Sequence, residues 1–198
     1  MESPAAAPQA QHPIRLIVND DLQRNRLTVF FRLLLAIPHF IVVGLWGILV
    51  YLVVVVAWIV AIFTGRVPDG LHNFMATWLR YATRVTAYAF LLADPFPAFG
   101  AGGTYPVDVR IDPAETQSRL TVFFRTYLAI PAFLLTYVFR MVNQLVALLG
   151  WFYCLFTGHM HQGMRDISAW LLRYETQTWG YVLLLTGRYP SLSGAPTA

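Results

Sequence analysis

The chain has 198 residues, of which 57% are hydrophobic and only 12% are charged, and its formal net charge is +4. With a mean hydropathy of +0.54, this composition excludes an ordinary soluble domain and is typical of a membrane protein. All 14 basic residues are arginines, and none forms a cluster in a soluble segment, so we expect no nucleic-acid partner. The single cysteine, Cys154, excludes a disulfide within the chain.

The chain contains one unit twice. The sequence RLTVFFR at residues 26–32 returns unchanged at residues 119–125, and the same offset of 93 residues aligns the Ala-Ile-Pro and Phe-Thr-Gly segments of the two halves. Residues 14–97 set over 107–190 give 28 identities in 84 positions without a gap. The repeat therefore defines the domain organisation. We expect disordered tails at 1–13 and 193–198, repeat units at 14–99 and 105–192, and a glycine-rich linker at 100–104.

Each unit begins with a short predicted β-strand. Apolar and polar residues alternate over residues 14–18 and again over 107–111, which is the pattern of a half-buried strand. A polar turn follows each strand. Because a single short strand is not stable alone, we expect the two strands to pair with each other outside the bilayer.

An interfacial helix is predicted next in each unit. RLTVFFR and the residues up to Pro38 or Pro131 combine phenylalanines with arginines six residues apart, which suits the boundary between headgroups and acyl chains. Proline removes a backbone N–H and crowds the preceding turn. We therefore expect the chain to kink at Pro38 and at Pro131, before the membrane span begins.

The next segment of each unit is long and apolar enough to cross a membrane. We place the spans at residues 39–63 and 132–156, and the second contains only one charged residue, Arg140. About 24 helical residues extend over roughly 36 Å, which exceeds a hydrocarbon core of about 30 Å. Phe-Thr-Gly ends each span, and glycine is the usual residue just beyond a helix.

The last helix of each unit, at 70–93 and 163–186, carries several charged residues, and each charge costs about 2.5–3.5 kcal/mol at the bilayer centre. These segments are therefore predicted to be amphipathic helices on the membrane or against the spans. The predicted fold is an all-α integral membrane protein: a tandem repeat of interfacial helix, transmembrane helix and amphipathic helix, with a short β-strand before each unit. Two crossings in an inverted arrangement are our default, and four crossings are the alternative, because the arginines show no bias that fixes the orientation.

One polar face distinguishes the second span from the first. Arg140, Asn143 and Gln144 lie at helical spacing and replace Gly47, Val50 and Tyr51 of the first unit. Ionisable groups inside a membrane often line a pathway or bind a partner, but arginine can also snorkel to a headgroup while Asn and Gln join helices by hydrogen bonds. Both interpretations stay open from the sequence.

Four further arginines are candidates for contact with anionic lipid headgroups because they lie beside aromatic residues: Arg32, Arg125, Arg80 and Arg173. The pair His159 and His161 offers at most two metal ligands, so we predict no metal site and no cofactor. No nucleophile, phosphate-binding loop or paired-carboxylate pattern occurs, and we expect no enzymatic activity. Asp166 and Glu175 are expected to be solvated or paired with Arg165 and Arg173.

The motifs also carry a family resemblance. The second half contains four motifs in a fixed order: YPVDVRID, SRLTVFFRTYLAIP, an apolar span ending in FTG, and LLRYETQTWGYVLLLTGRYP. This order resembles the bacterial membrane family known as domain of unknown function 4389. The resemblance covers residues 14–99 and 105–192, and the second copy matches better at its tail, where the first copy departs with ADPFP. It implies a small integral membrane protein with repeated units, and it supplies no catalytic residues.

Three functions follow as hypotheses from the sequence. The first is a non-enzymatic scaffold or accessory subunit of a membrane complex. The second is a small oligomeric transporter or channel that uses the polar face of the second span. The third is binding of anionic lipids at the arginine and aromatic belts. In each case the expected partners are the lipid bilayer and a membrane protein or further copies of this chain. We expect a multi-pass protein of a bacterial inner membrane, since abundant alanine without lysine is typical of GC-rich bacterial genes.

Overall fold

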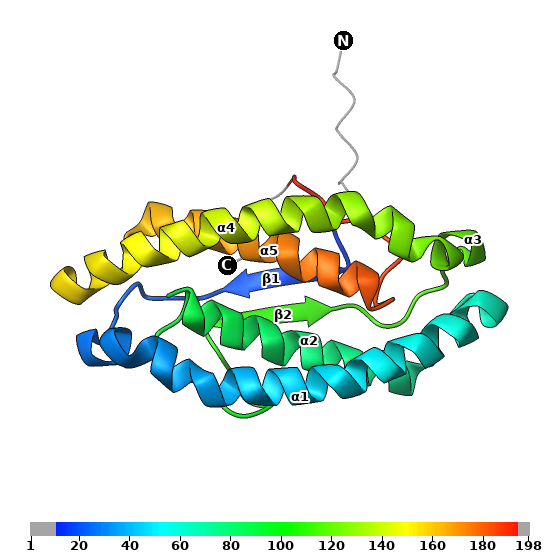
Figure 1. Cartoon of the computed structure of the whole chain (residues 1–198), viewed down its shortest axis with the longest axis horizontal. Helices are drawn as coiled ribbons and strands as arrows, with labels where there is room; N and C mark the ends of the chain where they lie inside the picture. Colours follow the sequence, from blue (N-terminus) through cyan, green and yellow to red (C-terminus); the bar gives the residue numbers. More distant parts are fainter. Residues whose placement is uncertain (1–10, 194–198) are drawn as a thin grey trace, which may run out of the picture.

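A computed structural model describes residues 11–193 and contains the two predicted units (Figure 1). The first unit consists of strand β1 (Ile14–Val18) and helices α1 (Arg26–Thr64) and α2 (Asp69–Ala89). The second consists of strand β2 (Val107–Ile111), a short helix α3 (Arg119–Phe123), and helices α4 (Arg125–Thr157) and α5 (Gln162–Val182). The mostly helical, two-unit organisation is thus confirmed. Residues 1–10 and 194–198, which make up most of the predicted tails, lie outside the described residues.

The two strands pair with each other, as expected. They form a two-stranded antiparallel sheet in which Leu16 lies opposite Val109 and Val18 opposite Val107. The alternating pattern of the sequence gives the sheet two different faces. Buried Ile14, Leu16 and Val109 project to one side, and the arginines Arg15 and Arg110 alternate with them along the strands.

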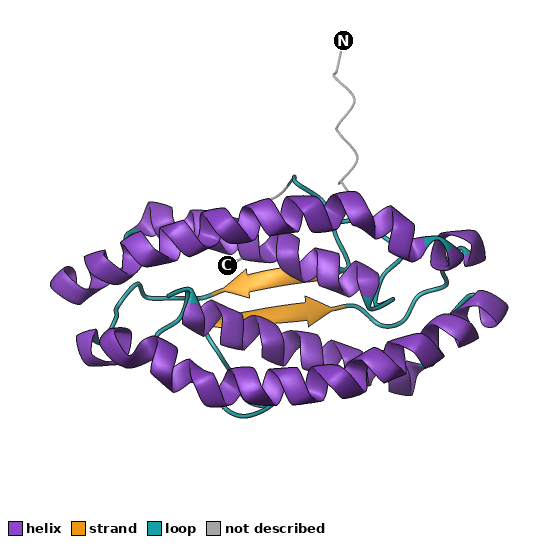
Figure 2. Ribbon diagram, viewed as in Figure 1, coloured by secondary structure: helices purple, strands orange, loops and turns teal. Residues whose placement is uncertain are grey.

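In the view of Figure 2 the two strands lie between two helix pairs, α5 with α4 and α2 with α1, and the contacts between the elements define three layers. The sheet packs on α2 and α5, which also contact each other. On the other side of these two helices lie α1, which packs on α2, and α4, which packs on α5. Within the described residues neither α1 nor α4 contacts the sheet. The order is therefore sheet, then α2 with α5, then α1 with α4, and the two long helices form an outer layer.

The two units are related by an approximate two-fold axis, and they hold each other by the same contacts made twice. Trp58 Nε1 donates to the Val122 carbonyl at 2.9 Å, and Trp151 Nε1, 93 residues later, donates to the Val29 carbonyl at 2.8 Å. Near the axis, the hydroxyls of the equivalent residues Thr83 and Thr176 lie 3.4 Å apart. Because each unit supplies hydrogen-bond donors and acceptors to the other, they form one body rather than two independent domains.

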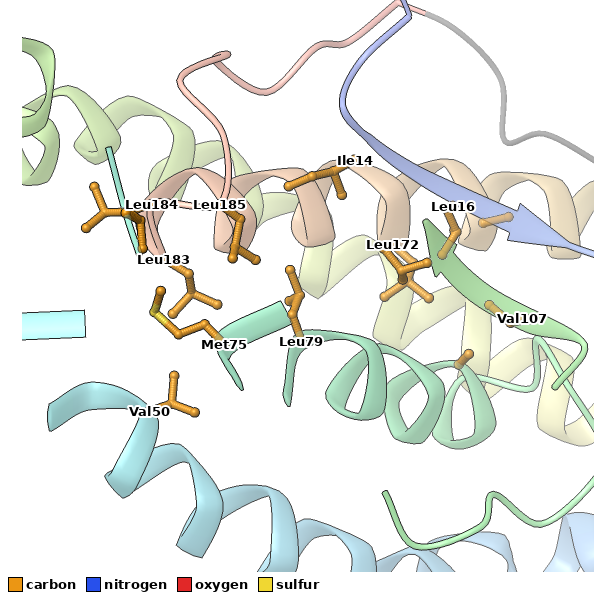
Figure 3. Close-up of a cluster of buried hydrophobic side chains, with 14 of the residues drawn as sticks. Ile14, Leu16, Val50, Met75, Leu79, Val107, Leu172, Leu183, Leu184 and Leu185 are labelled. Carbon is orange, nitrogen blue, oxygen red and sulfur yellow. The ribbon is translucent and has the colours of Figure 1, made fainter. Parts of the chain in front are cut away.

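The central layer and the inner face of the sheet form the main core. Figure 3 shows Met75 and Leu79 of α2 beside Leu183 and Leu185 at the end of α5, and all four side chains are buried. Val50 of α1 approaches this cluster from the outer layer. The core thus joins all three layers through α1, whereas α4 contributes Trp151 and Cys154 to a second, smaller cluster.

The prolines do not separate an interfacial helix from a span. Helix α1 continues without a break through Pro38, so the expected division at this residue is wrong for the first unit. In the second unit the helix is interrupted at Phe124, seven residues before Pro131, which lies inside α4. A proline removes one hydrogen bond, and a long helix can accommodate this loss by bending. Both helices bow outward in Figure 1. They end at Gly65 and Gly158, whose φ angles of 75° and 76° favour glycine.

Candidate functional site: a polar seam between α4 and α5

The polar face predicted on the second apolar helix meets a matching polar face on α5. We call this set the polar seam; it consists of Thr136, Arg140 and Asn143 of α4 and of Ser168, Glu175 and Thr178 of α5. Thr136 Oγ1 donates to Thr178 Oγ1 at 3.1 Å. Arg140 Nη1 donates to Glu175 Oε1 at 2.7 Å. The structure therefore brings Arg140 into contact with α5, and it buries Asn143, the second of the three predicted residues, on the same helix.

The ion pair in the seam is unequally exposed. The Arg140 side chain is 47% exposed and that of Glu175 only 9%. Burial raises the pKa of Glu175 above its ordinary value, and the nearby Arg140 guanidinium opposes this shift. The expectation is thus wrong for Glu175, which pairs with Arg140, and it is confirmed for Asp166, which pairs with Arg165 at 2.8 Å. A half-exposed guanidinium anchored by a buried carboxylate can contact a polar group outside the chain on its free side.

Two side chains of the seam have no polar partner within the described part of the chain. Asn143 is 1% exposed, and both its Nδ2 and its Oδ1 lack a hydrogen bond. Ser168 is fully buried, and its Oγ also lacks one. An unpaired buried polar atom costs about 1–3 kcal/mol, so these two side chains are a local weakness of the α4–α5 contact. Gln144, the third predicted residue, is exposed and lies outside the seam.

The seam is specific to the second unit, and each of its pairs has an apolar or small counterpart in the first. Thr136 and Thr178 replace Val43 and Val85, Arg140 and Glu175 replace Gly47 and Ala82, and Asn143 and Ser168 replace Val50 and Met75. The sequence analysis singled out Arg140 and Asn143 of α4 and missed Glu175, Ser168 and Thr178 of α5. The sequence did contain a signal for these three residues. When the two units are aligned at the offset of 93 residues, α5 has polar residues where α2 has Met75, Ala82 and Val85.

The structure places Arg32 and Arg125 inside the protein rather than at headgroups. Arg32 is 1% exposed and donates to the carbonyls of Tyr88 and Ala93 at 2.8 Å. Its equivalent Arg125 donates to those of Tyr181 and Thr186 at 2.6 and 2.7 Å. The positive charge thus lies at the end of α2 or α5, where the helix dipole favours a cation, and it joins a carbonyl of the last turn to one in the segment that follows. Arg32 and Arg125 therefore bind backbone carbonyls of the protein and do not make the predicted contact with lipid headgroups.

Arg80 and Arg173 differ from that pair and from each other. Arg80 forms a two-pronged ion pair with Asp108 of β2 at 2.5 and 3.1 Å, and its side chain is 37% exposed on the sheet side. Burial raises the pKa of Asp108, but its hydrogen bonds from Arg80 and from Arg84 outweigh this and leave it lowered. Arg173 is buried and donates to the carbonyls of Ser191 and Ser193. Of the four predicted headgroup contacts, only Arg80 has a partly free guanidinium.

The two units also enclose an apolar groove of about 680 Å³ between α1 and α4. Trp78 of α2 and Trp179 of α5 line it together with Gly47, Val54 and Phe133 of the two outer helices. Gly47 lies against the indole: a Cβ at this position would be in ordinary van der Waals contact with the Trp78 ring, at 3.5 Å. No group of three or more His, Cys, Asp or Glu side chains with metal-binding geometry occurs between residues 11 and 193. The chemistry available in the groove is the binding of an apolar chain.

Comparisons with known proteins agree with the repeat. The family model described as domain of unknown function (DUF4389) matches twice, at residues 26–100 and at 119–193. Each match begins at the first residue of α1 or α3, so both strands precede the matched regions. No curated protein and no solved structure matches the chain. Since the two matches cover most of the chain, the protein belongs to this family and contains two tandem copies of its domain.

Proposed function

We propose that this protein is an integral membrane protein without a reaction of its own, which acts as a scaffold or accessory subunit of a membrane complex. One observation carries the proposal. Of the 42 large hydrophobic side chains that are exposed among the described residues, 18 lie on α1 and 16 on α4. A soluble monomer rarely exposes so large a continuous apolar surface. Helices α1 and α4 are also the two that are long and apolar enough to cross a membrane.

The polar groups of the chain support a structural role over a catalytic one. The buried arginines satisfy helix ends, and the polar seam connects α4 to α5. These groups therefore fix the positions of the long helices, whose outer faces stay free for lipid and for a partner. A scaffold requires this combination of a rigid interior with a large exposed surface.

The test is extraction followed by mass measurement of the native complex. We expect the chain to stay with the membrane during an alkaline carbonate wash. We also expect it to come out in mild detergent with another membrane protein at fixed stoichiometry. Leu49→Arg on the exposed face of α1 places a charge in lipid at a cost of about 2.5–3.5 kcal/mol and should reduce membrane retention. Thr77→Arg, on exposed α2 surface, is the matched control and should not. A chain that always purifies alone, as a monomer, would contradict the scaffold.

A transporter or channel formed by several copies is the second candidate. The half-exposed Arg140 favours it, because its guanidinium has a free side in an otherwise apolar layer. If copies placed Arg140 around a common axis, Arg140→Leu would abolish the flux of an anion into vesicles while leaving membrane retention unchanged. A homo-oligomer that holds only lipid in the native mass spectrum would direct attention to this candidate.

A further inference from the structure

We propose that the protein lies in one leaflet of the bilayer, with α1 and α4 parallel to the membrane plane and the sheet in water. The proposal rests on the membrane association argued above and specifies the surface that meets lipid. It differs from the two crossings predicted from the sequence. The partner of the outer layer is therefore the acyl region of a single leaflet, and both ends of each long helix stay on the same side of the membrane.

The first argument is that polarity is divided between the faces of the molecule. Helices α1 and α4 carry no Asp, Glu or Lys, and their only charged residues are Arg26, Arg32, Arg125 and Arg140. The opposite face, formed by the sheet and α2, exposes Asn73, Thr77 and Arg110, and it also carries the Arg80–Asp108 ion pair. Since the sheet lies on the far side of α2 and α5 from the long helices, one face is apolar and the other is polar. A protein that is half embedded in a leaflet requires this division.

The second argument is length. The exposed apolar side chains of α1 extend from Leu27 to Phe63, which is about 55 Å of helix at 1.5 Å per residue. A hydrocarbon core is about 30 Å thick, so a crossing helix would need a tilt of roughly 57° to keep this stretch in lipid. Transmembrane helices are tilted by about 0–40°. A helix that lies along the membrane plane has no such limit.

The third argument is the position of the sheet. Figure 1 shows β1 and β2 near the middle of the long axis, beside the centre of α1 and α4 rather than at an end. If the long helices crossed the bilayer, Arg15, Arg110 and the Arg80–Asp108 pair would lie close to its centre. Each of these charges costs about 2.5–3.5 kcal/mol there. With the helices in the plane, the same residues face water at no cost.

The apolar groove fits the same arrangement. It lies between α1 and α4 on the side of α2 and α5 that faces away from the sheet, because it is lined by these four helices and by Leu183 and Leu184 just after α5, and by no residue of β1 or β2. Trp78 and Trp179 line it. In one leaflet, an acyl chain can fill this groove, so that the outer layer has no unfilled space beneath it. In water the same groove would expose Tyr51 and Val55 beside the tryptophans.

The experiment measures from which side of the membrane single cysteines react. Cys154→Ser gives a cysteine-free background, and four variants each add one thiol: Gln23→Cys before α1, Asp69→Cys after it, Arg110→Cys on the sheet, and Leu49→Cys in the middle of α1. All four positions are exposed. The chain is produced in a bacterial host and treated with a membrane-impermeant maleimide in spheroplasts and in inverted vesicles. Labelling in detergent provides the total reactivity of each thiol.

The proposal predicts that the first three thiols react in the same preparation and that Leu49→Cys reacts in neither. If Gln23→Cys and Asp69→Cys react in opposite preparations, α1 crosses the bilayer and the proposal fails while membrane association stands. Reaction of Leu49→Cys in either preparation would also overturn it, because that face would then be in water. If an alkaline wash releases the chain as a soluble dimer, a second copy covers the apolar layer, and membrane association fails as well.

Discussion

Replacing the unpartnered pair of the polar seam by its first-unit counterparts should stabilise the protein. The double variant Asn143→Val with Ser168→Met copies Val50 and Met75, both of which are buried in the main core. It removes three buried polar atoms without a hydrogen bond, at about 1–3 kcal/mol each. The longer methionine must fit between α4 and α5, and overpacking costs about 1–3 kcal/mol. We therefore expect a net gain of about 2–4 kcal/mol in the free energy of unfolding.

The assay is thermal unfolding in a fixed mild detergent, followed by the tryptophan fluorescence. For a domain of this size, such a gain raises the midpoint by about 5–15 °C. The reverse exchange in the first unit, Val50→Asn with Met75→Ser, is the matched control and should lower the midpoint, because it buries new polar atoms and leaves a cavity. If the second-unit variant is destabilised by about 1 kcal/mol or more, Asn143 and Ser168 have partners such as water or a ligand. The site would then be a binding site rather than a weakness.

Three further predictions concern the contacts that hold the layers together. Trp58→Phe and Trp151→Phe each remove one hydrogen bond between the units and should lower the free energy of unfolding by similar amounts, about 1–2 kcal/mol, in denaturant titrations. Arg125→Met removes the hydrogen bonds to the Thr186 carbonyl and to the Tyr181 carbonyl, which keeps that of the Leu184 N–H, and should cost about 1–3 kcal/mol, seen as faster proteolysis after α5. The raised pKa of Glu175 means that the folded state binds its proton more tightly than the unfolded state, so stability falls as the pH rises from the ordinary carboxyl pKa through the raised one. Glu175→Gln should remove this slope in thermal scans between pH 4 and pH 8, and an unchanged slope would mean that the carboxyl is not buried.

The sequence predicted the elements because their signals are local or repeated. The alternation at residues 14–18 and 107–111 specified both strands, and the offset of 93 residues related the two halves without any structure. The strand pairing followed from the instability of a single strand. The interruption of the second unit at Phe124 was missed, since the same RLTVFFR sequence continues as one helix in the first unit. Identical local sequence cannot distinguish the two outcomes.

The roles of the arginines could not be predicted in the same way. Arg32 and Arg80 both lie beside aromatic residues, and both have a pattern that suits a headgroup. Whether a guanidinium reaches lipid or a helix end depends on whether carbonyls return to it from distant parts of the chain. Arg32 meets the Ala93 carbonyl, 61 residues later, whereas Arg80 meets Asp108 of the sheet. Such contacts depend on the tertiary fold.

The asymmetry between the units has a physical consequence for assembly. Glu175 without Arg140 would leave a buried carboxylate unpaired at a cost of about 3–5 kcal/mol, so α5 requires α4 as its neighbour. Helix α2 has Ala82 at the equivalent position and offers no such group to α4. Two similar units could exchange their helices, and packing α5 on α1 would place Glu175 opposite Gly47. The seam therefore favours the observed pairing of α4 with α5, and this specificity offsets the cost of polar groups inside an otherwise apolar contact.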